Sequence, residues 1–223
     1  MSALKILVLE NKNSSNSQII KALYNNGFNI EICKNDDEFL DSIYEKHYDL
    51  YLISIDENSL PRFELMKALN DFKDLTLKMV ITSVPNTTKR SFLYGCDECV
   101  IKNLADEKEI ILRIKALIRR QFNIYSDTLF LRKNIKYDIF NKRIFKDNHE
   151  IYLSEKPLLI IDYLLKFRGF FVSPENLETG VYPASSRSKN AAIRFHIHKI
   201  RQLFGNDIIT SNRTNGYKIN IDL

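Results

Sequence analysis

Side chains capable of chemistry follow the apolar runs in the first half of the chain. They combine carboxylates, hydroxyls, an amide and an ammonium group: Glu10, Asn11, Ser54, Asp56, Thr82 and Lys102. If these runs are parallel strands, the side chains meet at the carboxyl edge of one sheet, where such folds form their sites. Ser54 has no neighbouring histidine to act as its base, and the sequence contains no Gly-rich phosphate-binding loop. An enzyme with a small-molecule site is therefore the disfavoured alternative.

A second group of such residues lies in a helix predicted over Lys189–Phe204, which stops at Gly205. Its apolar positions recur at spacings of four, three and four residues, and predict one buried face: Ile193, Ile197, Ile200 and Phe204. The other faces carry mostly basic and polar side chains: Lys189, Arg194, Phe195, His198, Lys199, Arg201 and Gln202. Many helices carry lysine and arginine only on a solvated face, but a basic helix also fits the major groove of DNA.

The segment after this helix favours the DNA interpretation. Ile208-Ile209 and Tyr217-Lys218-Ile219 are typical of two short strands, and the turn between them contains Asn215-Gly216, a strong hairpin signal. Arg213 lies near the tip of this hairpin, where it can enter a minor groove. Double-stranded DNA is the predicted partner.

The elements that position the first group alternate along residues 1–122. Five short apolar runs predict strands: Leu4–Glu10, Phe28–Cys33, Leu50–Ile55, Met79–Thr82 and Cys99–Ile101. Helices are predicted between and after them: one that stops at Asn25-Asn26-Gly27, then Asp37–His47, Pro61–Phe72, Lys89–Tyr94 and Glu107–Gln121. Asp106 and Glu109 have capping-box spacing. The pattern predicts an α/β fold with a doubly wound, five-stranded parallel sheet.

The second half predicts a smaller α+β unit. Four strand-like pieces come first, within residues 129–131, 135–137, 143–146 and 150–153. Ser154 is predicted to cap a helix over Pro157–Phe167, and Ser173-Pro174-Glu175 to open another with Leu177 inward. A short polar joint separates the halves, so the predicted domains are residues 1–122 and 128–223 with a linker at 123–127.

Composition limits the classes of function. Residues 1–122 carry 17 basic and 18 acidic side chains, whereas residues 123–223 carry 16 and 10, so a polyanionic partner belongs to the second half. The sequence has no apolar run long enough for a membrane span and no signal peptide, and we expect a cytoplasmic protein without membrane association. Three cysteines are too few and odd in number for a disulfide scaffold.

Several of these motifs together resemble the OmpR/PhoB class of bacterial response regulators over nearly the whole chain. The resemblance rests on four stretches: Gly95-Cys96-Asp97-Glu98, residues 113–120, residues 196–201 and residues 213–218. It implies a receiver domain, similar in fold to CheY and flavodoxin, followed by a winged helix-turn-helix DNA-binding domain. The resemblance also implies contact between the loop of residues 180–187 and RNA polymerase.

In that family two acidic residues hold Mg²⁺, an Asp accepts a phosphoryl group, and a Thr or Ser and a Lys respond to it. Glu10, Thr82 and Lys102 match, but Asn11 stands at the second acidic position and Ser54 at that of the phosphoacceptor. A neutral hydroxyl is a poor substitute for a carboxylate with Mg²⁺. We therefore expect a degenerate, cofactor-free receiver, independent of phosphorylation. A conventional phosphorelay regulator that uses Asp56 is the alternative.

The resemblance implies a homodimer formed through the last elements of the receiver. The charged residues expected at this interface are Lys89, Arg90, Asp97, Glu98, Arg113 and Arg120. Reciprocal ion pairs across a two-fold axis suit such a mixed surface, although exposed pairs contribute only about 0–1 kcal/mol each. A solvated helix face is the alternative.

Cys96 and Cys99 form a C-x-x-C pair near the predicted fifth strand. Such a pair can respond to oxidants, which leaves a redox-responsive or small-molecule-responsive regulator as a further alternative. Zinc would need two more ligands, so no metal site is predicted. A cysteine on an apolar strand is also commonly a small buried side chain.

By the same resemblance, Phe195 and Lys199 face base edges, with Phe195 on thymine methyls and Lys199 on guanine. Phosphate contacts are expected from the surrounding cations of the helix, and further contacts from the hairpin: Lys189, Arg194, His198, Arg201, Arg213 and Lys218. RNA or an acidic protein as partner of the basic half is the remaining alternative.

Overall fold

The computed structural model describes residues 3–10, 17–56, 59, 61–72, 74–84, 86–102, 104–186 and 190–222. The chain divides into two compact units. The N-terminal unit comprises Ala3–Ile43 and Tyr48–Leu117, and the C-terminal unit comprises Tyr44–His47 and Ile118–Leu223. The division falls within one helix, before its last turn. The distinct roles predicted for residues 1–122 and 128–223 stay predictions.

A five-stranded sheet forms the centre of the N-terminal unit. Its strands are all parallel and lie in the order β2-β1-β3-β4-β5: β1 Lys5–Leu9, β2 Asn29–Cys33, β3 Leu50–Ile55, β4 Leu77–Thr82 and β5 Glu98–Ile101. Every residue of β3 is buried because helices cover both faces of the sheet, which explains its continuous apolar sequence. The predicted doubly wound parallel fold is confirmed.

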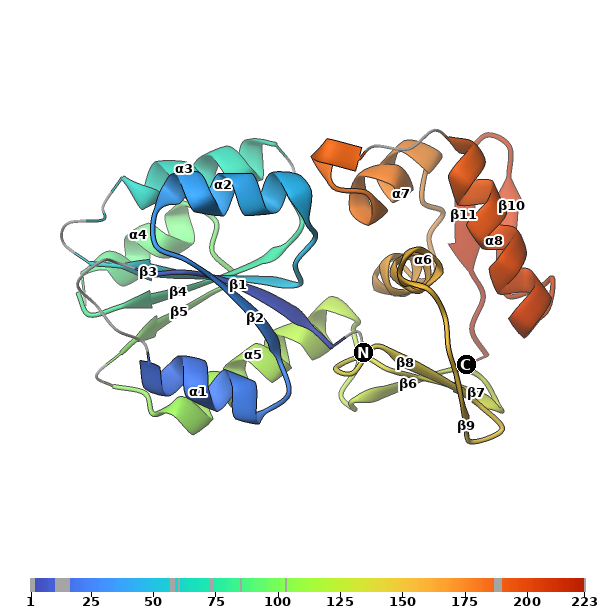
Figure 1. Ribbon diagram of the computed structural model, residues 1–223, viewed down its shortest axis with the longest axis horizontal. Helices are drawn as coiled ribbons and strands as arrows, with labels where there is room; N and C mark the ends of the chain where they lie inside the picture. Colours follow the sequence, from blue (N-terminus) through green and yellow to red (C-terminus); the bar gives the residue numbers. More distant parts are fainter. Residues whose placement is uncertain are drawn as a thin grey trace. The chain divides into compact units, whose positions relative to one another are not determined.

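Five helices cover the sheet: α1 Ser17–Asn25, α2 Asp36–Glu45, α3 Arg62–Asp71, α4 Thr87–Leu93 and α5 Glu107–Gln121. α2, α3 and α4 lie on one face and α1 and α5 on the other (Figure 1). Phe39 and Phe63 are fully buried beneath α2 and α3, in a core that Leu7 and Ile53 share from the sheet. The parallel strands thus end at one edge, which brings the residues that follow them together.

The ends of two helices show how local sequence sets their boundaries. Asp106 caps α5, since its carboxylate accepts from the backbone N–H of Glu109 at 2.7 Å, as the capping-box spacing predicts. α4 begins two residues earlier than predicted, at Thr87. The buried Thr87 hydroxyl donates to the carbonyl of Val84 at 2.6 Å and fixes this first turn. A hydroxyl contact to the preceding loop leaves no periodic signal in the sequence.

The C-terminal unit begins with an antiparallel sheet in the order β6-β7-β8-β9: β6 Thr128–Arg132, β7 Ile135–Asp138, β8 Arg143–Lys146 and β9 His149–Ile151. Three helices and a hairpin follow: α6 Glu155–Lys166, α7 Pro174–Val181, α8 Asn190–Phe204, and β10 Ile209–Asn212 with β11 Gly216–Ile219 (Figure 1). This arrangement is a winged helix-turn-helix, and we call β10, β11 and their connecting turn the wing. The predicted fold class is confirmed for both halves.

The helix starts in this unit differ in how they are capped. Ser173 caps α7 as predicted, because its hydroxyl accepts from the N–H of Asn176 at 3.2 Å, and Leu177 is buried. Ser154 is the N-cap residue of α6, as predicted, but its side chain makes no capping hydrogen bond. The helix begins at Glu155, two residues earlier than the predicted start at Pro157.

A buried charged cluster lies in the core of the C-terminal unit. The carboxylate of Asp162, which is 3% exposed, accepts from the hydroxyl of Tyr137 at 2.6 Å. It also pairs with the ammonium groups of Lys166 at 2.9 Å and Lys142 at 3.9 Å. A buried carboxylate is tolerated when it is paired and hydrogen-bonded in this way. The cluster joins β7, α6 and the turn before β8.

The end of α5 is built into the same core. The ring of Phe122 is buried, with its centroid 6.3 Å from that of Tyr137, and the ammonium group of Lys166 lies 5.4 Å from it. The guanidinium of Arg168 donates to the carbonyls of Phe122 and Asn123. These carbonyls follow the last turn of α5, where a helix leaves acceptors without intrahelical partners.

The wing is fastened to the segment before α7. Val172 and Tyr217 exchange two backbone hydrogen bonds, of 2.8 and 2.9 Å, so Val172 extends the hairpin by one bridge. Gly216, which precedes Tyr217, has a φ of +97° and lies against the backbone of Val172.

None of the helices in the described part of the chain is long and apolar enough to cross a bilayer.

Candidate nucleic-acid interface and strand-end site

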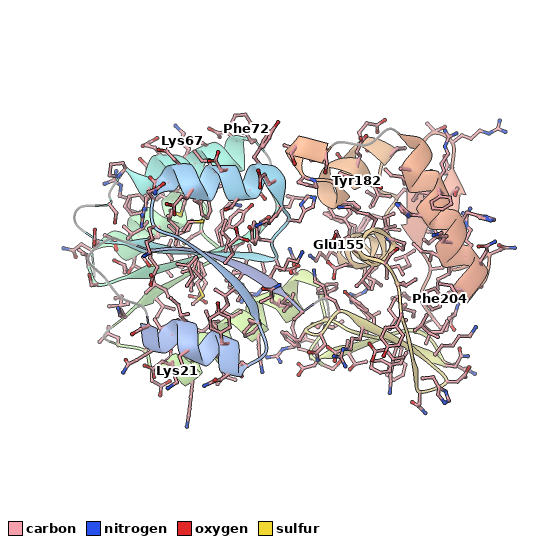
Figure 2. All side chains as sticks on the ribbon, in the orientation of Figure 1. Lys21, Lys67, Phe72, Glu155, Tyr182 and Phe204 are labelled. Carbon is pink, nitrogen blue, oxygen red and sulfur yellow. The ribbon has the colours of Figure 1, made fainter. Side chains whose placement is uncertain are left out.

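The apolar face of α8 anchors this helix to the C-terminal unit. The predicted stripe is fully buried: Ile193, Ile197, Ile200 and Phe204. Phe204 is the last residue of the helix (Figure 2). Gly205 follows with a φ of +103°, and its N–H donates to the carbonyl of Arg201 at 2.8 Å, which closes the helix. The predicted inward face and the stop at Gly205 are confirmed.

The opposite face of α8 presents an aromatic and cationic pair. Phe195 is 54% exposed, and the ammonium group of Lys199, one turn later, lies 4.6 Å from the centre of its ring. Arg194 and His198 are exposed beside them. The cation–π contact holds the lysine over the ring and away from the core. Lys189, which was predicted to bind DNA, lies outside the described residues.

Arg201 connects α8 to the wing. Its Nε and Nη2 groups donate to the carbonyl of Ile209 at 3.2 and 2.7 Å, and Nη2 also donates to the hydroxyl of Ser211 at 2.6 Å. This use of the side chain was not predicted, because nothing in the local pattern pairs it with residues eight and ten positions away. Arg201 positions the wing, and its predicted phosphate contact stays a prediction.

The tip of the wing presents Arg213 to solvent. The side-chain carbonyl of Asn212 accepts from the backbone N–H groups of Thr214 at 2.8 Å and Asn215 at 3.0 Å, which fixes the turn. Arg213 lies within this turn and is exposed. The ammonium group of Lys218, on β11, lies 5.0 Å from the ring of Phe171 and is half-buried. The wing therefore presents an exposed arginine, Arg213, and a half-buried lysine, Lys218, whose ammonium group lies near an aromatic ring.

Those predicted chemical residues of the N-terminal unit that the structure describes lie at the carboxyl edge of its sheet. Ser54 is buried within β3, and Thr82 is buried at the end of β4, where its hydroxyl oxygen lies 2.9 Å from Thr87 Oγ1. Lys102 follows β5, and its backbone N–H donates to the carbonyl of Thr82 at 2.8 Å. Glu10 follows β1, while Asn11 lies outside the described residues.

Asp56 follows β3 and faces Ser59. Its backbone N–H donates to the Ser59 hydroxyl at 2.7 Å, and its carboxylate accepts from the same hydroxyl at 2.8 Å. This local loop holds the Asp56 carboxylate two residues beyond the strand position of Ser54. The sequence alternative in which Asp56 serves as phosphoacceptor stays a prediction.

Arg62, at the first position of α3, is the residue of this edge that the sequence analysis missed. Its guanidinium donates to the carbonyl of Ser54 at 2.7 Å, to the carbonyl of Glu10 at 2.9 Å and to the carboxylate of Asp36 at 2.9 Å. The residue is only 6% exposed. An arginine is rarely this buried unless it is paired, and it is inconspicuous in the sequence of an amphipathic helix.

The comparisons with known proteins agree with this architecture. No family model matches the chain. The transcriptional regulatory protein PmrA of Pectobacterium parmentieri is 24% identical over 217 residues, which is 96% of each chain. The transcriptional regulatory protein CusR of Escherichia coli K12 is 20% identical over 225 residues, covering 98% of each chain. The relatives of this chain are OmpR/PhoB-type response regulators.

Among solved structures, the response regulator DrrB, an OmpR/PhoB homologue of Thermotoga maritima, is 17% identical, with a TM-score of 0.47 over 98% of this chain and all of its own. The relatives among OmpR/PhoB-type regulators are transcriptional regulators rather than enzymes. The alternative of an enzymatic small-molecule site therefore has no support among them.

Response regulators of this class use Mg²⁺ at the strand edge, but the residues of this edge that the structure describes do not fit the metal. A neutral hydroxyl, Ser54, stands within β3 where a carboxylate ligand is required, and the guanidinium of Arg62 binds the carbonyls of both strand ends. Mg²⁺ prefers carboxylate oxygens and is repelled by a fixed cation. Among the described residues, no group of three or more His, Cys, Asp or Glu side chains could hold a metal ion.

Cys96 and Cys99 lie in an environment that favours the thiol form. Burial, followed by the neighbouring Cys99, raises the pKa of Cys96 to about 12. Burial also raises the pKa of Cys99. Since the thiolate is the reactive species, these shifts give no support to a redox response at neutral pH. The redox role of the pair stays a prediction.

Most of the charged residues that were expected at a dimer surface have partners within the chain. Arg113 pairs with Glu109 at 2.7 Å and with Glu98 at 3.3 Å, and these contacts raise its pKa, with the Glu109 hydrogen bond as the main cause. The guanidinium of Arg90 lies 4.5 Å from the ring of Phe63. The carboxylate of Asp97 accepts from the backbone of Lys78 at 2.7 Å. Lys89 and Arg120 are exposed.

Proposed function

We propose that this chain is a sequence-specific, double-stranded-DNA-binding transcription regulator that acts as a dimer and without phosphorylation. The observation that carries the proposal is the pair of Phe195 and Lys199, exposed on α8 while the opposite face of the helix is locked into the core. A helix held in this way can enter the major groove and keep a constant register. PmrA and CusR are themselves transcriptional regulatory proteins.

The proposed contacts with DNA fall into two groups, those that recognise bases and those that bind phosphates. Phe195 offers an apolar surface to thymine methyls, and Lys199 an ammonium group to guanine O6 and N7. Arg194 and His198 are exposed beside the pair and lie where phosphates flank a groove-bound helix. Arg213 at the wing tip reaches the adjacent minor groove. Arg201 supports this geometry because it fixes the wing against α8.

Replacing Lys199 by Ala tests the base-reading role. We expect the affinity for the specific site to fall by about 1–3 kcal/mol, with discrimination relaxed at one base position. Arg194→Ala should instead weaken specific and random DNA alike and lower the salt slope by about one, because a phosphate contact is independent of sequence. Both variants are measured by fluorescence anisotropy over a salt series, on sites first selected from genomic fragments.

Lys21→Ala is the matched control for charge. Lys21 is an exposed lysine of α1 in the N-terminal unit (Figure 2), so its loss changes the net charge by the same amount without touching α8. It should leave the affinity unchanged at physiological salt. The proposed register is wrong if Lys199→Ala and Arg194→Ala have the same effect on specific and random DNA. Tighter binding to RNA than to duplex DNA would reject the proposed partner.

The dimer is proposed to form at the β5 edge of the sheet, where α4 packs against the edge strand and Arg113 of α5 pairs with Glu98 of that strand. Because Arg113, Glu98 and Asp97 are engaged within the chain, exposed apolar side chains supply the larger share of the contact. Leu93 on α4 is 83% exposed, and Leu112 on α5 is exposed as well. Lys89 and Arg120 remain available for pairs across the two-fold axis.

We expect a dimer at tens of micromolar in sedimentation velocity, with no change on addition of a small phosphodonor and Mg²⁺. Leu93→Arg should weaken dimerisation by roughly tenfold or more, because it places a charge in an apolar contact. Phe72→Arg is the matched control, since Phe72 is 86% exposed at the end of α3, outside this surface (Figure 2). A monomeric wild type, or phosphodonor-driven dimerisation, would reject this part of the proposal.

A further inference from the structure

The guanidinium of Arg62 joins three elements at the carboxyl edge of the N-terminal sheet. Its Nη2 and Nη1 groups donate to the carbonyls of Glu10, just after β1, and Ser54, within β3. Its Nε group donates to the carboxylate of Asp36, the first residue of α2. The three acceptors are 52, 8 and 26 residues away in the sequence. One side chain therefore fixes the ends of two strands and the start of a helix.

The contacts of Arg62 are those of a bound cation. The three acceptors described above are all oxygen atoms, at 2.7–2.9 Å, and the one on Asp36 carries a negative charge. Two of the three are neutral carbonyls, which would gain little from an uncharged donor at this degree of burial. The planar guanidinium also supplies donors in several fixed directions, which an ammonium group on a flexible stem does not.

We propose that Arg62 is the resident cation of this edge and excludes a divalent ion from it. This inference rests on the proposed phosphorylation-independent function and supplies its physical cause. The positive charge is covalently part of the chain, so the edge is held in one arrangement whether or not Mg²⁺ or a phosphodonor is present. Ser54 then needs no carboxylate, because its backbone carbonyl, not its side chain, meets the cation.

The test is the thermal unfolding of the full chain in millimolar MgCl₂, compared with EDTA and NaCl of equal ionic strength. Mg²⁺ should not raise the Tm of the wild type. Arg62→Met keeps much of the apolar stem but removes the charge, and it should lower the Tm by on the order of 10 °C. Its Tm should also rise specifically on addition of Mg²⁺, because the Asp36 carboxylate and the carbonyls of Glu10 and Ser54 then lack the cation that binds them.

Arg62→Lys separates charge from packing. It keeps a positive charge but loses the planar set of donors that a guanidinium has. The Tm should therefore fall, and Mg²⁺ should still not raise it. Arg120→Met, which removes an exposed arginine of α5, is the control and should change neither quantity. If Arg62→Met does not fold, Arg62→Gln, which is also neutral, replaces it in the comparison with Arg62→Lys.

A Mg²⁺-specific rise in the Tm of the wild type, or equal responses of Arg62→Met and Arg62→Lys, would overturn the inference. DNA affinity is measured on the same samples, so that the two proposals fail separately. Stabilisation of the wild type by Mg²⁺ with intact DNA binding rejects the role of Arg62 alone. Absence of DNA binding with no response to Mg²⁺ rejects the proposed function and leaves the role of Arg62 standing.

Discussion

Asp162→Ala is expected to destabilise the C-terminal unit by about 3–5 kcal/mol, because it leaves two buried ammonium groups without their carboxylate. Lys166 lies 2.9 Å and Lys142 3.9 Å from that carboxylate, and both lysines are largely buried. The hydroxyl of Tyr137 loses its acceptor in the same step. Urea denaturation followed by circular dichroism measures the change in the free energy of unfolding.

Asp162→Asn is the control for shape. It keeps an acceptor for Tyr137 but removes the charge, so it should be nearly as destabilising if the ion pairs dominate. A loss below about 1 kcal/mol in both variants would show that the cluster is not a major source of stability.

The same cluster predicts acid sensitivity. Burial opposes ionisation of Asp162, but Lys142 and Lys166 outweigh it and hold the pKa of this carboxyl below its usual range. A depressed pKa in the folded state contributes stability above the unfolded value of about 4, and this contribution is lost as the pH falls further. Asp162→Asn should remove this part of the pH dependence in the acid limb of unfolding.

Gly216→Ala is expected to displace the wing and destabilise the C-terminal unit. The loss of stability should exceed the cost of placing a Cβ on a left-handed backbone. A Cβ at this position would overlap the carbonyl oxygen of Val172, which is engaged with the N–H of Tyr217. The left-handed backbone costs about 1–2 kcal/mol for a residue with a Cβ, and the overlap adds about 1–3 kcal/mol. Affinity for DNA should fall as well, because Arg213 is carried by the same hairpin.

Gly169→Ala is the matched control, since Gly169 has a similar φ of +88° but no atom within 4 Å of an added Cβ. It should show only the backbone cost. Unfolding free energies and DNA affinities of the two variants are compared directly. Equal losses in stability would mean that the wing moves to accommodate the Cβ, and that the bridge between Val172 and Tyr217 is not a rigid fastening.

Local periodicity predicted the fold and the buried face of α8 well. The spacing of Ile193, Ile197 and Ile200 identified the buried face of α8, and Asn215-Gly216 identified the hairpin turn. These signals lie within a few residues of one another, and the physical constraint acts over the same range. The order of strands and helices in the N-terminal unit followed from apolar runs in the same way.

The sequence could not show which cations are already engaged. Arg62 reaches an acceptor 52 residues away, and Tyr137 meets Asp162 over 25 residues. In the sequence, Arg201 does not differ from the other basic residues of the helix. In the structure, its guanidinium donates to the carbonyl of Ile209. Such pairings depend on how distant elements pack, which no periodic pattern encodes. For the same reason, the intrachain partners of Arg113 and Asp97 were missed when these residues were assigned to a dimer surface.

Two contacts of the segment after α5 determine where the protein can be cut into fragments. Phe122 is buried against Tyr137, and Arg168 donates to the carbonyls of Phe122 and Asn123. The last turn of α5 is a structural part of the C-terminal unit. Excising that half at residue 128, where its first strand begins, would strip away an aromatic side chain from its interior. An autonomous C-terminal fragment should therefore retain the helical residues from Ile118 onward.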